Sequence, residues 1–485
     1  MPRRLAIACP ERRATAAGEA AFAAGGNAID AALAAATTLA VTYPHNCGVG
    51  GDLFAVVRRP GRDPVALNAS GPAARAVSAA DQRTRGRRMP LSGPDPITVP
   101  GAVAGWGALH ALGAARPWAD SFAAAVAAAE DGFPIPRTLA VALTEHPDVA
   151  ALLDVEDDAL RQPALARTLR ALAAHGPREL YEGETAARLA AGLQARGSRI
   201  DAADLEAFAP EETAALTARF RGLDLFTAPP NSSGVLLLQA LAALDRAPRQ
   251  DLGTLARLLR AGMAQRAATL ADPRHVPFDR AAWLGDERLD ALARDHAVPE
   301  AGAPATGDTI AIVAADDSGL AVSLIQSLFG GFGARVLEPE TGILLHSRGA
   351  AFSLEPGHPN ELAPGKRPAH TLLPLVVERD GELAGVLGTM GGQAHAQFMA
   401  QVLLHLLDGD DAATAVARPR WVVGGIDPDR AVTEVQAEPG VPADDLRAAG
   451  FDVTSLPARS EHLGHTQAVW RLEAGSDPRA DGRAG

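Results

Sequence analysis

The chain has 485 residues and is 47% hydrophobic with few aromatic residues, a composition typical of a globular protein with a packed core. Its formal net charge of −13 argues against nucleic acid as a partner, because any basic patch would act against the overall field. The two cysteines, Cys9 and Cys47, imply no disulfide framework.

Targeting signals are weak along the chain. The basic start, MPRRLAIACP, carries an apolar run of only about five residues, which is shorter than a signal-peptide core and predicts a first strand. The most apolar stretch, residues 31–41, is far shorter than the roughly 18 residues that a membrane helix needs. We therefore expect a cytoplasmic protein that contacts no membrane.

The next segments predict two helices and a glycine turn. A helix over residues 14–24 should end at Gly25 and Gly26, and Asn27 should cap a second helix that runs through residue 39. The sequence YPHNCGVGGDLFAVV then predicts a turn and a strand. A phosphate-binding loop would precede its helix, whereas here the helix precedes the glycines. We therefore interpret the glycines as positions where two backbone segments pass close together.

The remaining chain changes character near residue 300. Residues 101–260 are mostly 3.6-periodic and predict a helical layer over a sheet, and residues 299–306 predict an exposed linker. The short apolar runs TIAIVAA, LAVSLIQS, TGILLHS, TLLPLVVE and LAGVLGTM then predict buried strands, followed by a helix at 394–407. Residues 473–485 predict a polar tail.

A Gly-Asp-Thr step opens the first of these later strands. The turn DDSG at 316–319 folds its flanks into a hairpin that places Thr309 opposite residues 325–327, so that Ser327 lies within reach. A threonine hydroxyl needs a base to act as a nucleophile. Cleavage between Asp308 and Thr309 would free an α-amine with a pKa of about 7.7–8.0, which is a suitable base.

An acyl-transfer site also needs donors for the oxyanion. The run GTMGGQAH places Gly391 and Gly392 between a predicted strand and a predicted helix, where their backbone N–H groups are unobstructed. On local sequence alone, these glycines also fit a tight turn, and Thr309 also fits an ordinary strand position. The histidines have no metal-ligand spacing and no nucleotide motif is found, so neither a metal nor a cofactor is expected.

Ten segments, in order, resemble the γ-glutamyltranspeptidase family of N-terminal-nucleophile hydrolases. They are AAGGNAIDAALAAA, PHNCGVGGD, VPGAVAGW, LYEGETA, APPNSSG, GDTIAIVAADDSG, TGILLHSR, GKRPAHTLLP, GTMGGQ and GSDPRADG. The resemblance implies an α+β fold, a four-layer αββα sandwich. It also implies a proenzyme that cuts itself before Thr309 into a large subunit, residues 1–308, and a small subunit, residues 309–485.

The resemblance assigns catalytic roles position by position. Thr309 matches the nucleophile, Ser327 the hydroxyl residue that supports it, and Gly391 and Gly392 the oxyanion glycines. The residues that recognise a glutamyl head group are changed instead. Positions of this kind are Asn68 in place of an arginine, Ala351 in place of an aspartate, Arg348 in place of a glutamine, His370 and Thr371 in place of two serines, and Phe329 in place of an asparagine.

These changes predict that γ-glutamyl compounds are poor substrates, since the two charges that read a zwitterionic head group are lost. Arg348 and His370 are expected to suit an acidic or α-keto acyl group. The leading prediction is a threonine amidohydrolase or acyltransferase on such a small molecule.

Two alternatives stay open at this point. One is hydrolysis of a carbon–carbon bond that releases an oxalyl group in a 4-alkylproline-type pathway. The other is an uncleaved, inactive binding or scaffold protein. The two predicted subunits should remain associated, and a homodimer or heterotetramer is possible.

Overall fold

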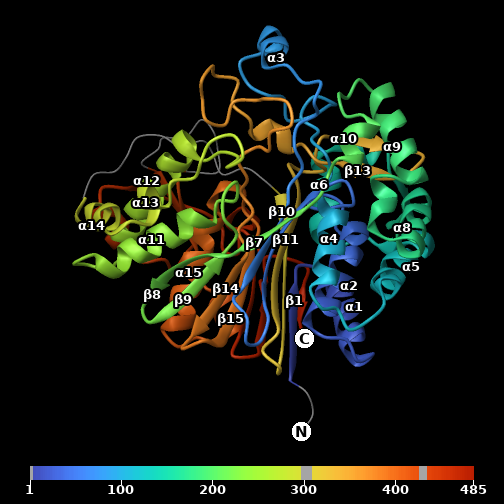
Figure 1. Cartoon of the computed structure of the whole chain (residues 1–485). Helices are drawn as coiled ribbons and strands as arrows, with labels where there is room; N and C mark the ends of the chain where they lie inside the picture. Colours follow the sequence, from blue (N-terminus) through green and yellow to red (C-terminus); the bar gives the residue numbers. More distant parts are fainter. Residues whose placement is uncertain (1–3, 296–307, 425–433) are drawn as a thin grey trace.

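The computed structural model describes residues 4–295, 308–424 and 434–485, and the predicted linker at 299–306 lies outside these ranges. Two antiparallel sheets stack face to face at the centre of the molecule, and helices cover the outer face of each (Figure 1). Among the described residues, no helix is both long and apolar enough to cross a membrane.

The first sheet has seven strands, and its order mixes early and late parts of the chain. The order is β21 (Arg483–Ala484), β1 (Leu5–Cys9), β10 (Asp308–Asp316), β11 (Ala321–Phe329), β2 (Asp52–Arg58), β3 (Val65–Ala69) and β7 (Glu211–Ala214). Strand β1 therefore lies between two strands that follow residue 307.

The second sheet has six strands. Its order is β20 (Glu473–Ser476), β19 (Thr466–Trp470), β15 (Glu382–Thr389), β14 (Leu375–Arg379), β9 (Leu223–Thr227) and β8 (Leu216–Phe220). Small side chains let it approach the first sheet closely. Gly388 of β15 lies directly over β10 and β11, since a Cβ there would be 2.9 Å from the Ala311 Cβ and 2.7 Å from the Ile325 Cδ1.

A helical layer packs on the outer face of the first sheet. Its main members are α1 (Arg12–Ala23), α2 (Ala28–Thr42), α4 (Ala102–Ala111), α5 (Ala123–Asp131), α8 (Pro163–His175) and α9 (Glu184–Ala195). The predicted cap is present, because Asn27 and Asp30 form a reciprocal capping box at the start of α2. All of α2 is buried, so its alanines are explained by close helix–sheet packing.

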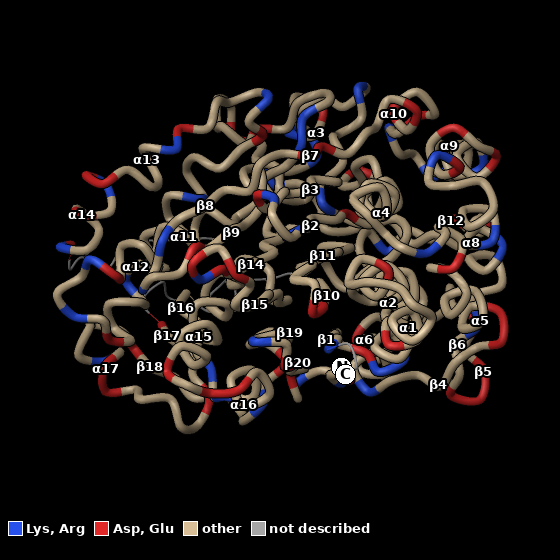
Figure 2. Tube along the Cα trace, turned by 60° about the horizontal axis from the view of Figure 1, so that its bottom comes forward, with Lys and Arg blue, Asp and Glu red and all other residues tan. Residues whose placement is uncertain are grey.

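A second helical layer packs on the outer face of the other sheet. It contains α11 (Gly234–Arg246), α12 (Leu252–Thr269), α13 (Arg280–Leu284), α14 (Asp286–Arg294), α15 (His395–Leu407), α16 (Ala412–Ala417) and α17 (Ala443–Ala448). The helix predicted at 394–407 is confirmed as α15. In Figure 2 these helices and those of the first layer lie on opposite sides of the strands.

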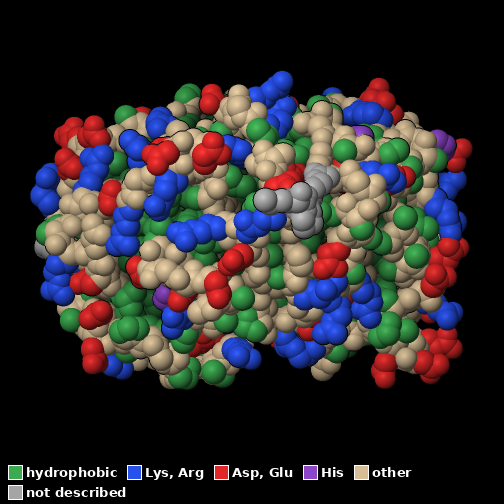
Figure 3. Space-filling model, turned by 90° about the horizontal axis from the view of Figure 1, so that it is seen from below, with side chains coloured by type: hydrophobic (Ala, Val, Ile, Leu, Met, Phe, Trp, Pro, Cys, Tyr) green, Lys and Arg blue, Asp and Glu red, His purple; other side chains and the backbone are tan. Residues whose placement is uncertain are grey.

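Shorter elements connect these layers. They are α3 (Ala79–Arg85), α6 (Arg137–Glu145), α7 (Pro147–Ala150), α10 (Ala202–Glu206), β4 (Phe133–Pro134), β5 (Asp154–Glu156), β6 (Ala159–Arg161), β12 (Val336–Glu338), β13 (Ile343–Leu345), β16 (Trp421–Val423), β17 (Glu434–Ala437), β18 (Asp452–Ser455), and the 3₁₀ turns η1 (Trp118–Phe122), η2 (Pro177–Leu180), η3 (Arg348–Ala351), η4 (Gly392–Ala394) and η5 (Glu461–Leu463). One face of the molecule carries acidic, basic and hydrophobic side chains side by side (Figure 3).

The prediction of a polar tail at 473–485 is wrong. The segment supplies β20 and β21, and it therefore completes an edge of each sheet. Between these strands Asp477 and Arg479 are buried. Composition suggested a tail because the segment is polar, but two of its charges, Asp477 and Arg479, are paired inside the protein.

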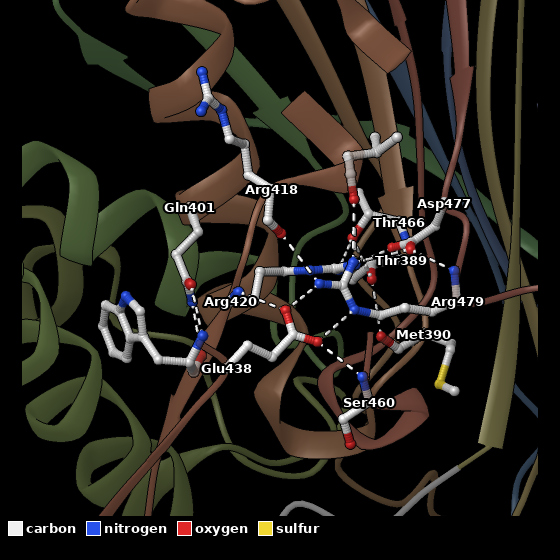
Figure 4. Close-up of polar contacts among 12 residues, drawn as sticks. Thr389, Met390, Gln401, Arg418, Arg420, Glu438, Ser460, Thr466, Asp477 and Arg479 are labelled. Carbon is white, nitrogen blue, oxygen red and sulfur yellow. Dashed lines mark hydrogen bonds and ion pairs between the residues drawn. The ribbon is translucent and has the colours of Figure 1, made fainter. Parts of the chain in front are cut away.

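Asp477 and Arg479 belong to a buried group of four charged residues, which we call the carboxy-terminal ion cluster: Arg420, Glu438, Asp477 and Arg479 (Figure 4). Asp477 accepts hydrogen bonds from Arg420 and, at 3.1 Å, from the Arg479 Nη1. Glu438 accepts one at 3.0 Å from the Arg479 Nε. Two cations thus meet two anions, and the formal charge of the cluster is balanced.

Candidate active site

Thr309 lies at an irregularity in the pairing of β10 with β11. Asp308 pairs with Phe329 and Ile310 pairs with Gln326, so two residues of β11, Ser327 and Leu328, oppose the single residue Thr309. Ser327 is therefore within reach of Thr309, as the hairpin predicted. The Thr309 Oγ1 donates a hydrogen bond to the Ser327 Oγ at 3.0 Å, and Thr309 is only 1% exposed.

Further contacts fix both residues in place. The Ser327 Oγ also accepts the backbone N–H of Phe329 at 2.8 Å, so its lone pairs and its orientation are constrained. The side-chain amide of Asn46 donates to the Thr309 carbonyl oxygen at 3.3 Å. Sequence reasoning missed Asn46, although it stands within the segment PHNCGVGGD that carries part of the resemblance.

The glycines of the same segment confirm the interpretation of a close backbone approach. A Cβ on Gly51 would lie 2.5 Å from the Ser327 carbonyl oxygen, which real side chains do not tolerate. The next residue, Asp52, begins β2 and is the register partner of Ser327. The turn therefore brings a carboxylate to the strand position beside the Thr309–Ser327 pair.

Asp52 is fully buried and surrounded by donors. One carboxylate oxygen lies 3.0 Å from the His370 Nε2 and 3.4 Å from the His346 Nδ1, and the other accepts the Gly71 N–H at 3.2 Å. Burial alone would raise the pKa of Asp52, but His346 and then His370 outweigh it and hold the pKa below its ordinary value. Asp52 is thus an anion whose oxygens are both occupied.

His370 uses both ring nitrogens within the protein. Its Nδ1 accepts the backbone N–H groups of Thr371 at 3.2 Å and Leu372 at 3.3 Å, so the proton is on Nε2, which faces Asp52. Burial lowers the pKa of His370 to about 3, and the ring is neutral. Contact of His370 and the buried Thr371 with substrate stays a prediction.

Arg348 is placed differently. It opens η3, whose last residue is Ala351, and its guanidinium lies 4.3 Å from the ring centroid of Phe329. The Nε is 3.9 Å from an Asp52 oxygen, yet none of its three nitrogens hydrogen-bonds to a described residue. Arg348 is 1% exposed, and burial lowers its pKa to about 9, so it remains a cation near neutral pH.

Asn68 is held in a hydrogen-bond network near the same site. Its amide nitrogen donates to the Asn231 Oδ1 at 2.9 Å, and its Oδ1 accepts from the Ser70 N–H at 3.0 Å and the Ser70 hydroxyl at 2.7 Å. Asn231 in turn donates to the Pro368 carbonyl at 2.7 Å, two residues before His370. Both polar atoms of the Asn68 side chain are therefore already hydrogen-bonded, and a substrate that contacts Asn68, as predicted, would have to share them with Asn231 and Ser70.

Gly391 and Gly392 connect β15 to η4 and α15. Their φ angles are 136° and 54°, and a Cβ on Gly391 would lie 2.4 Å from the Phe398 ring, so this bend requires glycine. The bend precedes the N-terminus of α15, where an anion is favoured. Their role as oxyanion donors stays a prediction.

Arg266 and His395 also reach this site, and sequence reasoning missed both. Arg266 on α12 donates to the Gln393 side chain and to the His370 carbonyl, each at 3.4 Å. His395 is the first residue of α15, directly after the segment GTMGGQ that was singled out. Among the described residues, no group of three or more His, Cys, Asp or Glu side chains could hold a metal ion.

Comparison with known proteins gives three relevant similarities. An oxamate amidohydrolase proenzyme of Klebsiella pneumoniae is 38% identical over 95% of this chain and 94% of that protein. A proenzyme of Bacillus subtilis named glutathione hydrolase-like YwrD is 31% identical over 99% of this chain and 97% of that protein. The crystal structure of cephalosporin acylase from Bacillus halodurans matches with a TM-score of 0.89 and 29% identity, covering 100% of this chain and 96% of that one.

A family model agrees with these similarities. The model described as Gamma-glutamyltranspeptidase matches residues 14–485. The match therefore includes the second sheet, all of the first sheet except β1, the Thr309–Ser327 pair and the glycine bend before α15. The chain belongs to the gamma-glutamyltranspeptidase family and is an enzyme of the N-terminal-nucleophile hydrolase class.

Proposed function

We propose that the protein cuts itself between Asp308 and Thr309 and then hydrolyses an amide of a small acidic or α-keto acyl compound. The products of the cut would be residues 1–308 and 309–485, joined in one four-layer αββα body. The proposal is carried by the hydrogen bond from the Thr309 hydroxyl to Ser327 at the head of β10. Two full-length relatives are named proenzymes, which supports the cut.

The proposed reaction uses Thr309 as nucleophile and base. Its freed α-amine takes the hydroxyl proton as the Oγ1 bonds to the substrate carbonyl carbon, and Ser327 orients that oxygen. The N–H groups of Gly391 and Gly392 bind the negative oxygen. The carbon–nitrogen bond then breaks, and the leaving amine receives the proton. Water hydrolyses the resulting ester by the same path and releases the acid.

A γ-glutamyl substrate is disfavoured by the charges around the site. Its carboxylate could meet Arg348, but its ammonium needs an anion, and both oxygens of Asp52 already accept hydrogen bonds from His370 and Gly71. Ala351 stands where the resemblance would require an aspartate. A small acyl group with a carboxylate and no amine suits this arrangement, and the relative named oxamate amidohydrolase supports that choice.

The test is a comparison of wild type with Thr309→Ala. Wild type should give two bands near about 32 and 18 kDa, dividing the 49.9 kDa chain in proportion to length, and mass spectrometry should find Thr309 at a new N-terminus. It should hydrolyse oxamate and release ammonia, with little turnover of a γ-glutamyl anilide. Thr309→Ala should stay a single chain with activity lower by at least about a thousandfold.

Three results would count against the proposal. An intact, active wild-type chain would remove the proposed base, and strong anilide turnover would contradict the exclusion of γ-glutamyl groups. Products from carbon–carbon cleavage in place of a released amine would favour the other reaction class.

A further inference from the structure

We propose that Arg348, Arg266 and His395 form a subsite that binds one carboxylate of the substrate acyl group and selects an anion over a neutral molecule. This inference rests on the proposed function and specifies its substrate class. Arg348 was the one residue of the three that the sequence suggested.

The first observation is the unused hydrogen-bonding capacity of Arg348. A guanidinium has five N–H donors, and in this buried position all three nitrogens lack a hydrogen-bond partner among the described residues. Leaving such a group unpaired inside a protein is costly, so native structures rarely do so without a reason. A carboxylate that accepts two parallel N–H bonds is its best geometric partner.

The second observation is His395, which is 1% exposed and lies beside the Thr371 backbone, with no well-formed hydrogen bond on either ring nitrogen among the described residues. It begins α15, a helix of 13 residues, so the positive end of the helix lies beside it. Burial, followed by the nearby Arg348 charge, lowers its pKa to about 3. A neutral imidazole keeps one N–H, which can donate to the same carboxylate.

The third observation concerns Arg266, whose hydrogen-bond partners among the described residues are all uncharged. It donates to the Ser233 hydroxyl at 2.8 Å, the Gln393 side chain and the His370 carbonyl. Arg266 lies 3.4 Å from the His370 carbonyl, the His370 ring lies 3.0 Å from Asp52, and Asp52 lies 3.9 Å from the Arg348 Nε, so a chain of contacts joins the two arginines. Arg266 also contacts Gln393, which directly follows Gly391 and Gly392. His395 stands two residues after Gln393.

The charges of this region do not balance. We call Arg266, Arg348, Asp52 and the three histidines at 346, 370 and 395 the site charge cluster. It holds two guanidinium groups and one carboxylate, and Asp52 is already hydrogen-bonded. One substrate carboxylate would offset the excess of guanidinium groups and accept hydrogen bonds from Arg348. A zwitterion or a neutral molecule would not.

Oxamate and oxamide provide a direct test, because they have nearly the same shape and differ in one carboxylate. We expect the uncut Thr309→Ala chain to bind oxamate at least about tenfold more tightly than oxamide, by calorimetry at fixed salt. Arg348→Met and Arg266→Met should each remove most of this preference. His395→Leu should weaken oxamate binding, and His395→Gln, which keeps a donor, should restore part of it.

Arg246→Met is the matched control. It removes the same charge from α11, where Arg246 pairs with Asp286 and Asp290, and it should leave the preference unchanged. Circular dichroism would verify that each variant is folded. Equal binding of oxamate and oxamide, or binding of neither at millimolar concentration, would overturn the inference.

These outcomes are separable from failure of the proposed function. If Thr309→Ala prefers oxamate while wild type neither cuts itself nor releases ammonia, the subsite stands and the hydrolase proposal falls. If wild type hydrolyses amides without any preference for an anion, the hydrolase proposal stands and the subsite falls.

Discussion

Two buried charge clusters in this molecule differ in how completely they are paired. In the carboxy-terminal ion cluster, Arg420 and Arg479 meet Asp477 and Glu438, and among the described residues only the Arg420 Nε lacks a hydrogen bond (Figure 4). The site charge cluster holds two arginines and only one carboxylate, which lies 3.9 Å from the Arg348 Nε, and Arg348 makes no hydrogen bond to any described residue.

This difference distinguishes a structural cluster from a binding site. A buried charge with complete pairing holds segments together, and removing one member leaves its partners exposed to an apolar interior. A buried cation with free donors contributes little to the fold in the absence of a ligand. The two clusters should therefore respond in opposite ways when an arginine is replaced.

The largest expected effect is on stability, in the carboxy-terminal ion cluster. Arg479→Met leaves Glu438 and Asp477 buried without their shared cation, and it should lower the free energy of unfolding by about 3–5 kcal/mol. Urea unfolding of the uncut Thr309→Ala chain measures this within a single polypeptide. A change below about 1 kcal/mol would show that the pairing is not structural.

The next effect is on binding, in the site charge cluster. Arg348→Met should change the free energy of unfolding by less than about 1 kcal/mol, because no hydrogen bond to a described residue is lost and a methionine can still pack on the Phe329 ring. Asp52, 3.9 Å from the Arg348 Nε, keeps its hydrogen bonds to His370 and Gly71. In the processed enzyme the same substitution should raise KM for an anionic amide by about 10–150-fold, the equivalent of 1.5–3 kcal/mol for a charged hydrogen bond. A strongly destabilised Arg348→Met variant with unchanged KM would show that Arg348 stabilises the fold and does not bind substrate.

A smaller effect should appear as acid sensitivity of the site. Burial lowers the pKa of His395 and of His370 to about 3, whereas an unfolded histidine titrates near about 6.5. The unfolded chain therefore binds more protons between these values, and stability falls as the pH falls. Each histidine should contribute about 1.4 kcal/mol per pH unit below about pH 6.

Unfolding measurements from pH 6.5 to 5 would test this sign. His395→Gln should reduce the slope of the free energy of unfolding against pH by the contribution of one histidine. The charged and titratable groups that face this imidazole, Arg348, Arg266 and His370, are unchanged in the variant. His175→Gln is the control, because that side chain is 66% exposed. An unchanged slope in His395→Gln would mean that this imidazole does not stay neutral when folded.

Local signals predicted the elements and the contact between Thr309 and Ser327 well. The Asn27 cap, the hairpin turn at 316–319 and the glycines before β2 act over a few residues, and each was confirmed. Thr309 and Ser327 are joined by one short hairpin, so their proximity followed from the turn. The register at Thr309 contains an extra residue on β11, which strand alternation alone does not reveal.

The rest of the site depends on contacts that no local pattern encodes. Asp52 meets His346 and His370 across about 300 residues of sequence, and Arg266 comes from a helix in the other layer. Asp52 stands in a segment that was singled out, but its partners could not be named without the fold. The same reason explains the buried Asp477, which looked like part of a solvated tail.

The interlaced strand order has a consequence for the lifetime of the enzyme. Strand β1 is held between β21 and β10, so a cut before Thr309 would leave two polypeptides threaded through both sheets. Two such pieces could not separate without losing the core. Once separated by heat or denaturant, neither would hold a complete sheet, and reassembly would be a slow bimolecular event that competes with aggregation. The durability of a cut form would therefore be governed by its rate of unfolding.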